Sequence, residues 1–483
     1  MNKIGVRYKN IKLGFLASWV LVITLGVFIQ GFWVVYFNPF TLMMHKQYTY
    51  HKMQYFDDHD TFNSVVTTMV PLGAMVGAFS ISPLLSFGRR FSLLFVDFVI
   101  IIGALWNTVF SIWALLFGRL LVGWGWGATS VICPLMINEI SPVQISGILG
   151  SIVQNKACLG FTLACAIGFI VPYEFDQHGN ENTEIYFSTV WRWTFLLPGI
   201  IALIQVLLLT TVFTYDTPVF YEKIHRFDIA DEVYSRIYVE KETDTRLFKS
   251  ISTINSTVDT LNNEDRASFI GKKSTSFWDI FSSNYRYTLF VGTMLSVFRC
   301  TTGAYSIMFY SNEIFTEGYT GYAAELEARI GTMMIGLALL FTSFLSTILL
   351  SKLGRRSILI IGHLGMLLTL IPLGIYTIYR MDSFIIAFTV LYILFFNSSI
   401  GTLSWICSAE ILNESGMSFS TFVIWALIVL FSLFTNQAFK LLTPEGIYFV
   451  FGVFQFLSVL FCIFILKETK GLTRDQWQKL YIE

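Results

Sequence analysis

The chain has 483 residues, of which 54% are hydrophobic and only 13% charged, and its formal net charge is zero. Soluble domains carry about 25% charged residues. One buried core cannot absorb so much apolar surface, so most of the chain must face lipid, and the neutral balance gives no support to a nucleic-acid partner.

About twelve apolar runs are long enough to cross a bilayer as helices, which predicts an all-α membrane protein. The first run follows a basic N-terminal segment and is too long for a signal-peptide core, so we expect it to be a retained span. The predicted spans cover approximately residues 13–37, 62–84, 91–110, 112–134, 146–172, 192–213, 287–311, 328–351, 357–379, 383–407, 419–440 and 446–466.

Two polar stretches interrupt this rhythm. Residues 38–61 contain three His and several Asp, which is compatible with a metal site, but a solvated loop is the simpler interpretation. Residues 214–286 are polar with mixed charge, and we expect helical stretches there, for example over 228–250. The second stretch is predicted to join the two halves of the chain.

A short basic turn occurs twice, at residues 87–90 (Phe-Gly-Arg-Arg) and 353–356 (Leu-Gly-Arg-Arg), each time between two apolar runs. Repetition after about half the chain indicates that the halves are copies of one membrane unit. The sequence thus predicts two six-helix bundles with related structures. Their expected limits are 1–213 and 287–467, with 214–286 as an intracellular linker and 468–483 as a tail.

Positive charge gives the expected orientation. The N-terminal segment, both basic turns, the linker and the tail fall on one side, whereas the opposite loop 173–190 has four acids and no Lys or Arg. Because Lys and Arg collect in loops that are not translocated, both termini are expected on the cytoplasmic or matrix side.

Several motifs resemble those of the sugar porter family of the major facilitator superfamily, along nearly the whole chain. Trp191-Arg192-Trp193 opens the sixth span, and Lys467–Thr473 resembles the family's closing PETKGLT element. Further matching residues are Gly118, Arg119, Gly123, Gly125, Gly127, Pro134, Glu139, Ile140, Ser141, Pro142, Asp216, Thr217, Pro218, Ala409 and Glu410. The resemblance implies the major facilitator fold and transport of a small solute by alternating access between two bundles.

The resemblance also implies a gate of charge pairs at one membrane face. Its acids would be Glu139 and Glu410, and its bases Arg89, Arg90, Arg119, Arg355 and Arg356. The alternative is that these charges only anchor helix ends and set topology. Several usual partners are missing, since Leu85, Ser146, Val219, Ser351 and Met417 stand where the family has charged residues.

Most of the amides with which the family binds sugars are also replaced. Arg299, Cys300 and Tyr305 occupy amide positions of the seventh span, and Leu339 and Ile424 occupy those of the eighth and eleventh. The prolines that would loosen the tenth span are absent. The substrate-binding candidates are Gln154 and Trp405, which match the family, together with Arg299, Tyr305 and Trp33; Trp33 stands where some proton-coupled members have an acid.

The lost amides decide the expected affinity. About five amides making one or two bonds each contribute about 5–8 kcal/mol, or about four to five decades in affinity. We therefore expect that the chain does not carry glucose in the family's usual way.

Three ionisable residues lie deep in apolar runs: Asp97, Lys156 and Arg299. Each needs a partner or a wet cavity. Arg299 either recognises an anionic substrate with its planar fork or is neutralised by Asp97 or by backbone carbonyls and holds helices together. Lys156 is two residues after Gln154, about 200° around a helix, so both cannot face one cavity.

The sequence shows no phosphate-binding loop, paired-His metal helix or nucleophile elbow, so neither an enzyme nor a cofactor is expected. The leading hypothesis is a secondary transporter or facilitator of a small sugar-like or anionic solute. The alternative is a transporter-derived structural subunit of a larger membrane complex, for example an organellar or mitochondrial one, because the sugar-binding amides and the gate have both eroded.

Overall fold

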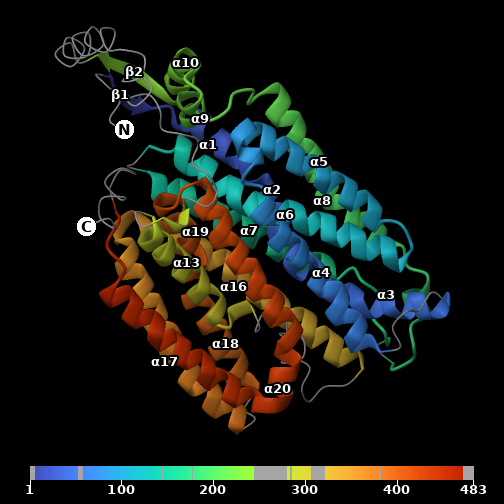
Figure 1. The fold of residues 1–483 in the computed structure, drawn as a ribbon. Coiled ribbons are helices and arrows are strands. Elements are labelled where there is room, and N and C mark those ends of the chain that lie inside the picture. The colour runs from blue at the N-terminus through green and yellow to red at the C-terminus, as the bar shows by residue number, and fades with distance from the viewer. Residues whose placement is uncertain are drawn as a thin grey trace.

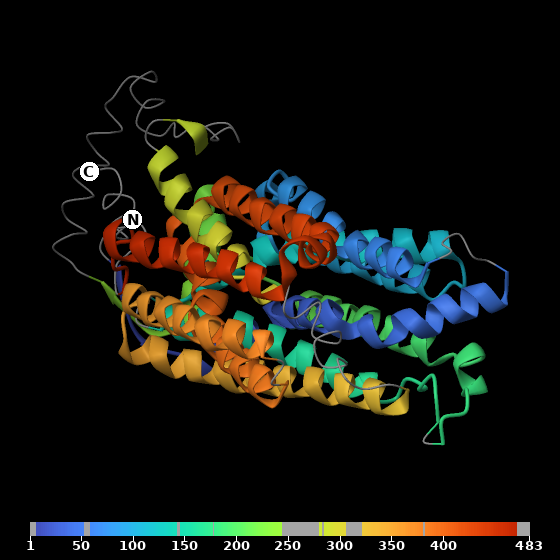
Figure 2. The ribbon, with the colours of Figure 1, turned by 90° about the horizontal axis from the view of Figure 1, so that it is seen from below.

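A computed structural model describes residues 6–52, 58–142, 145–176, 178–243, 280–282, 285–305, 321–379 and 382–470. Almost all of them form helices that run along one common direction (Figures 1 and 2). The helices up to residue 211 lie together, and those from residue 286 onward lie beside them (Figure 1). These two groups are called the N half and the C half below.

The N half contains six membrane-crossing segments. The first is interrupted at Thr24, whose hydroxyl donates back to the carbonyl of Val20, 2.8 Å away. The helices of the N half are α1 (Leu13–Ile23), α2 (Leu25–Tyr36), α3 (Asn38–Tyr50), α4 (His59–Ser80), the 3₁₀ turn η1 (Leu84–Phe87), α5 (Arg89–Asn107), α6 (Ile112–Ile140), α7 (Ser146–Gly168), the 3₁₀ turn η2 (Thr183–Tyr186) and α8 (Val190–Thr211).

The C half contains α13 (Arg286–Thr301), α16 (Tyr322–Lys352), α17 (Arg355–Ile378), α18 (Asp382–Ser398), α19 (Ile400–Ile411) and α20 (Glu414–Phe464). The tenth predicted span is interrupted at Ser399 although it lacks the family's prolines. The last two predicted spans form one continuous, bent helix, α20 (Figure 1).

Eleven segments among the described residues are long and apolar enough to cross a membrane. They correspond to eleven of the predicted spans. The seventh span is represented by α13, and residues 306–320, which would complete it, lie outside the described residues. The prediction of an all-α membrane protein with the major facilitator fold is confirmed.

The polar stretches differ from the predictions. Residues 38–50 form helix α3 rather than a loop, because Pro39 occupies the first turn and the segment continues the direction of α2. In the linker, helix α10 (Phe227–Ile237) ends earlier than expected, and strand β2 (Tyr238–Thr243) follows. It pairs antiparallel with β1 (Val6–Ile11), beside the short helix α9 (Pro218–Lys223). The remainder of the linker, 244–279, lies outside the described residues.

Glycine and alanine allow close packing within the N half. A Cβ atom added at Gly123 or Gly127 of α6 would overlap the backbone carbonyl of Val70 or Ala74 in α4. Lipid does not drive helices together, so such close van der Waals contact supplies the association. All six cysteines are buried and unpaired, as expected for packing residues.

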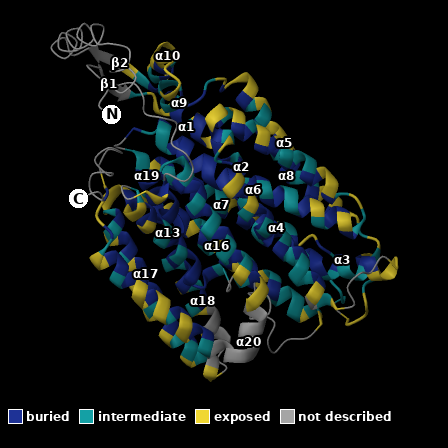
Figure 3. Ribbon diagram, viewed as in Figure 1, coloured by how far each residue is buried: buried dark blue, intermediate teal, exposed yellow. Residues whose placement is uncertain are grey.

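The two halves meet along α7 and α16, and along α4 and α20. Buried residues concentrate where the halves meet, whereas the outer faces of α5 and α17 are exposed and apolar (Figure 3). Exposed Phe95, Phe98, Leu368 and Ile371 illustrate this surface, which suits contact with lipid chains. The chain is therefore an integral, multi-pass membrane protein. The end of the bundle that carries β1, β2 and α9 is called the terminal end.

Candidate functional site

A central cavity with about 1000 Å³ of empty space, part of it open to solvent, lies between the two halves. Both halves contribute to its wall. From the N half, α2, α4, α6 and α7 line it, and from the C half α13, α16, α18, α19 and α20 line it. A cavity shared by two bundles is a typical location for the solute site of a secondary transporter.

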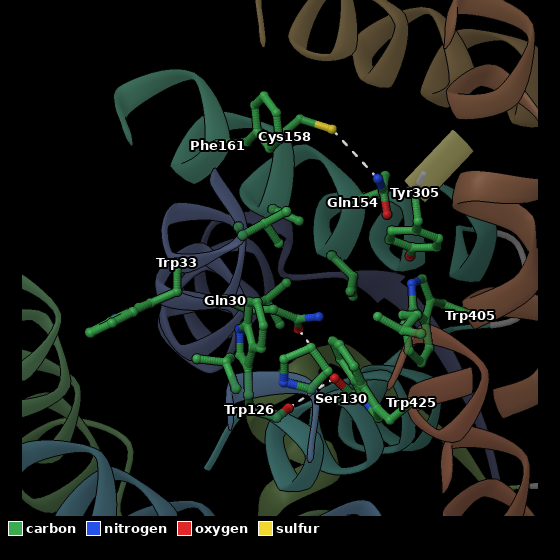
Figure 4. Close-up of a pocket in the computed structure, with 18 of the residues that line it drawn as sticks. Gln30, Trp33, Trp126, Ser130, Gln154, Cys158, Phe161, Tyr305, Trp405 and Trp425 are labelled. Atoms are coloured by element: carbon green, nitrogen blue, oxygen red, sulfur yellow. Dashed lines mark hydrogen bonds between the residues drawn. The ribbon is translucent and has the colours of Figure 1, made fainter. Parts of the chain in front are cut away.

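All five predicted substrate-binding residues line this cavity: Trp33, Gln154, Arg299, Tyr305 and Trp405. Four of them gather at the boundary of the halves, and Figure 4 shows Gln154 of α7 facing Tyr305 and Trp405. Lys156 is not part of the lining, in agreement with its predicted position on α7.

Trp33 is oriented differently from the other four. Its ring points away from Gln154, Tyr305 and Trp405 in Figure 4 and stacks on Phe195 of α8, with 5.7 Å between ring centroids. Only 2% of its surface is exposed. The indole of Trp33 therefore packs into the wall of the cavity, and little of it is accessible to a solute.

Arg299 is held by neutral acceptors. Its Nη1 donates to the backbone carbonyl of Gly401 and to Ser404 Oγ at 2.8 Å, and its Nε donates to Tyr305 Oη at 3.0 Å. The guanidinium also lies 5.0 Å from the ring centroid of Trp405. Among the described residues, Asp97 is not its partner, and both Asp97 carboxylate oxygens are buried without a hydrogen bond. The expectation of a partner for Asp97 is thus not met within this part of the chain.

Further polar residues lie in or beside the cavity: Gln30 and Ser130 line it, whereas Asn397 is fully buried and is not part of the lining. Asn397 of α18 accepts a hydrogen bond from Gln154 Nε2 at 2.8 Å and donates to the carbonyl of Leu339 at 2.7 Å. Gln30 of α2 accepts from Ser130 Oγ of α6 at 3.3 Å (Figure 4). These amides come from positions that the comparison with the family motifs did not cover; Gln30 lines the cavity, whereas both polar groups of the Asn397 amide bond within the protein.

Arg119 lies far from the predicted gate. It lines the central cavity, where its Nε donates to the carbonyl of Val66 at 2.8 Å and its guanidinium lies 4.1 Å from the ring centroid of Phe37. Glu139 is twenty residues further along the same helix, about 30 Å away at 1.5 Å per residue. Arg119 and Glu139 therefore cannot pair, and Arg119 belongs with the cavity rather than with the gate candidates.

The other gate candidates form two clusters at the terminal end. In the first, Arg89 pairs with Glu139 of α6 at 2.7 Å and with Glu414, the first residue of α20. Glu414 also pairs with Lys223 at 3.0 Å, and Glu139 accepts a hydrogen bond from Thr217 Oγ1 at 2.5 Å. Since Glu414 belongs to the C half, this cluster ties the two halves together. Glu414 was not predicted, although it lies four residues after Glu410 in sequence.

The second cluster lies within the C half. Arg355 pairs with Glu410 at 3.1 Å, and Glu468 accepts the backbone N–H groups of Arg355 and Arg356 at 2.9 and 3.1 Å. Arg356 donates through Nε to the carbonyl of Cys462. A further link between the halves is the hydrogen bond from Asn138 to the carbonyl of Ala409, at 2.8 Å.

Arg90 completes the first basic turn, and its side chain joins no acid among the described residues. Its Nε donates to the carbonyl of Leu209 at 2.9 Å, and its backbone N–H donates to Asp216 at 3.0 Å. Asp216 is buried at the membrane surface, and burial raises the pKa of its carboxyl to about 6.

Two bundles of membrane-spanning helices around one central cavity define the chain as a membrane transporter of the major facilitator fold. A family model described as "Sugar (and other) transporter" matches residues 19–481. The chain therefore belongs to this family, which is a family of transporters and not of enzymes.

Curated relatives cover most of the chain. It is 27% identical to hexose transporter 1 of Plasmodium falciparum, over 96% of this chain and 92% of that protein. It is 28% identical to the glucose transporter GlcP of Staphylococcus epidermidis and to the galactose-proton symporter of Escherichia coli, over 86% of this chain and 88% and 85% of those proteins.

A solved structure of the proton:xylose symporter XylE, bound to 6-bromo-6-deoxy-D-glucose, shares the fold. The TM-score is 0.77 and the identity 20%, over 97% of this chain and 99% of that one. An inward-open structure of XylE from E. coli gives a TM-score of 0.65 over 96% of this chain and all of the other.

Proposed function

We propose that the chain is a secondary transporter that moves a small polar solute across a membrane by alternating access. The observation that carries this proposal is the central cavity, whose polar side chains come from both halves. Gln30, Ser130 and Gln154 belong to the N half, and Arg299 and Tyr305 to the C half. A solute held between such groups is released to one side when the halves separate at that end.

In this proposal, residues 1–213 and 287–467 act as the two moving bundles, 214–286 connects them, and 468–483 forms a tail. The terminal end faces the cytoplasm or an organellar matrix, since both basic turns lie there. The cluster of Arg89, Glu139 and Glu414 supports a gate at this end, because it joins the halves through a largely buried pair.

Named relatives suggest the solute class to test first. Hexose, glucose and galactose appear in the names of the relatives, and the amides of Gln30 and Gln154, which line the cavity, suit hydroxyl groups. The purified chain in liposomes should take up at least one radiolabelled hexose, pentose or hexose derivative in a saturable manner.

A cross-link between the halves tests alternating access directly. Ser82 Oγ of the N half and Ser415 Oγ of α20 lie 3.3 Å apart at the terminal end. A disulfide in the S82C/S415C variant should stop uptake, and reduction should restore it. Ser86, which is exposed, provides the matched control, because S86C alone has no cysteine opposite it. Uptake that persists in the oxidised double variant would contradict the mechanism. Absence of uptake of every solute by the wild-type chain would favour a structural subunit instead.

A further inference from the structure

Among the residues that the structure describes, the lining of the central cavity has two guanidinium groups and no carboxylate. Arg119 of α6 and Arg299 of α13 both line it, and no Asp or Glu is among its lining residues. Their exposed fractions are 2% and 5%, so each charge is removed from bulk water. A charged side chain inside a membrane costs about 2.5–3.5 kcal/mol on insertion scales, and a buried charge normally has a partner.

Neither guanidinium has an acidic partner among the described residues. Arg119 uses only its Nε, toward Val66, and its Nη1 is buried without an acceptor. Arg299 uses Nε and Nη1, both toward neutral oxygens, and Nη2 makes no hydrogen bond within this part of the chain. Each residue therefore retains N–H donors and a full positive charge.

The surroundings of Arg299 orient its free donors. Gly401 and Ser404 fix one edge of the guanidinium to α19, and the ring of Trp405 lies 5.0 Å from it. Tyr305 accepts from Nε through its hydroxyl oxygen, which leaves the hydroxyl proton as a donor. Nη2 therefore provides the remaining N–H donors of Arg299, and a charged N–H donor beside a hydroxyl donor suits an oxygen of a carboxylate or phosphate.

We propose that the cavity binds a small hydroxylated organic anion, with its carboxylate or phosphate on Arg299 and its charge further stabilised by Arg119. Hydroxyl groups of the same molecule reach the amides of Gln30 and Gln154 and the hydroxyl of Ser130. Sugar acids and sugar phosphates have this chemistry. The inference rests on the proposed function only in taking this cavity as the solute site.

Binding to the purified full-length chain tests the inference. The measurement is the ligand concentration that gives half of the maximal rise in melting temperature, for D-glucose, D-glucuronate, D-glucose 6-phosphate and inorganic phosphate. At least one of the three anions should act at a concentration about tenfold or more below that of glucose. Comparison of D-glucuronate with D-glucose 6-phosphate then shows whether the site prefers a carboxylate or a phosphate. Comparison of D-glucose 6-phosphate with inorganic phosphate shows whether the sugar part of the molecule contributes to binding.

Variants connect this preference to the two arginines. In R299Q and in R119Q the preference for the anion over glucose should fall to about twofold or less, and R299K should retain an intermediate preference, because Lys keeps the charge without the planar guanidinium. R192Q is the matched control, since Arg192 is exposed near the start of α8. Glucose acting at the same or a lower concentration than every anion, or an unchanged preference in R299Q and R119Q, would overturn the inference.

Uptake into liposomes separates this inference from the transport proposal. If neutral hexose is carried and no anion binds, the chain is a transporter and the anion inference fails. If an anion binds to the wild-type chain, its binding is lost in R299Q and no solute is carried, the anion inference holds and the transport proposal fails.

Discussion

Asp216 and Glu468 hold equivalent positions at the basic turns of the two halves. Asp216 accepts the backbone N–H of Arg90 at the start of α5, and Glu468 accepts those of Arg355 and Arg356 at the start of α17. A carboxylate at a helix N-terminus satisfies free N–H groups and interacts favourably with the helix dipole.

The same arrangement explains the glycine in each turn. A Cβ atom at Gly88 or Gly354 would overlap the carboxylate of Asp216 or Glu468. Gly88 in addition has a φ of 121°, which other residues rarely adopt. Each basic turn is therefore a site where a carboxylate from a distant segment fixes the start of a helix.

The raised pKa of Asp216 makes stability depend on pH. Burial raises this pKa to about 6 from 3.8. The folded state then holds the proton more tightly than the unfolded state, so its stability falls as pH rises from about 4 to 6, by about 3 kcal/mol in total. In D216N this contribution is absent. Melting temperature between pH 4 and 7 should thus fall less steeply in D216N than in the wild-type chain.

D228N is the control for this prediction, because Asp228 is exposed in the first turn of α10. The melting temperature of D228N should fall with pH as steeply as that of the wild-type chain. An identical slope in D216N and the wild-type chain would show that Asp216 does not titrate in this range.

The pair between Arg89 and Glu414 should hold the halves together at the terminal end. E414Q removes the acid that Arg89 and Lys223 share, while Arg89 keeps Glu139. Because Glu414 is partly exposed, we expect the joined arrangement of the halves to lose about 1–2 kcal/mol relative to the separated one. This corresponds to about a 5- to 30-fold shift toward separated halves. Spin labels at exposed Ser86 and Ser351 would measure the distance between the halves.

The distance distribution in E414Q should gain a longer component. E232Q removes an exposed pair within α10, Glu232 with Arg236, and should leave the distribution unchanged. If both variants match the wild-type chain, the pair does not control opening.

Close approach between α4 and α6 should make Gly127 intolerant of a side chain. G127A places a methyl group against the carbonyl of Ala74, which can move only if the helices separate. Overpacking of this kind costs about 1–3 kcal/mol or more. The melting temperature in detergent should fall by several degrees. G374A in α17 adds the same atom where nothing lies within 4 Å, and it should be neutral or stabilising.

Sequence reasoning succeeded where the signal is local. Long apolar runs located the spans, and the spacing of Gln154 and Lys156 predicted which of them lines the cavity. It failed where structure depends on distant partners. Strand β1 pairs with β2 more than two hundred residues later, and neither strand has a strong pattern of its own. The helix interruptions at Thr24 and Ser399 occur without a proline that would have predicted them from the sequence.

The candidate site shows the same division. Arg299 was recognisable because a charge in an apolar run is conspicuous. Asn397 was not, since its role depends on Gln154, which is 243 residues away in sequence. Arg119 was assigned to the gate from its motif, yet helix α6 carries it about 30 Å from Glu139. Position along a long helix, rather than residue type, decides which function a charge can serve.

The contact of Gln154 with Asn397 should position the cavity amides. Asn397 is fully buried, and it joins α7 of the N half to α16 and α18 of the C half through Gln154, Leu339 and Thr342. In N397A, Gln154 loses its oxygen acceptor and keeps only the weak hydrogen bond to Cys158 Sγ at 3.5 Å, so its amide is freer to rotate in the cavity. We expect a loss of about 1–3 kcal/mol of stability. If Gln154 contacts the solute, the KM for uptake should rise by about tenfold with little change in kcat.

T342V is the matched control, because it removes one neighbour of Asn397 and leaves the bond to Gln154 in place. Its KM should stay near the wild-type value. Q154A shows whether Asn397 acts by positioning Gln154 or by contacting the solute. If Gln154 binds the solute, N397A and Q154A should raise the KM by similar factors. The double variant should then raise it no further, since both changes remove the same interaction. Additive effects in the double variant would show that Asn397 contacts the solute itself and does not act through Gln154.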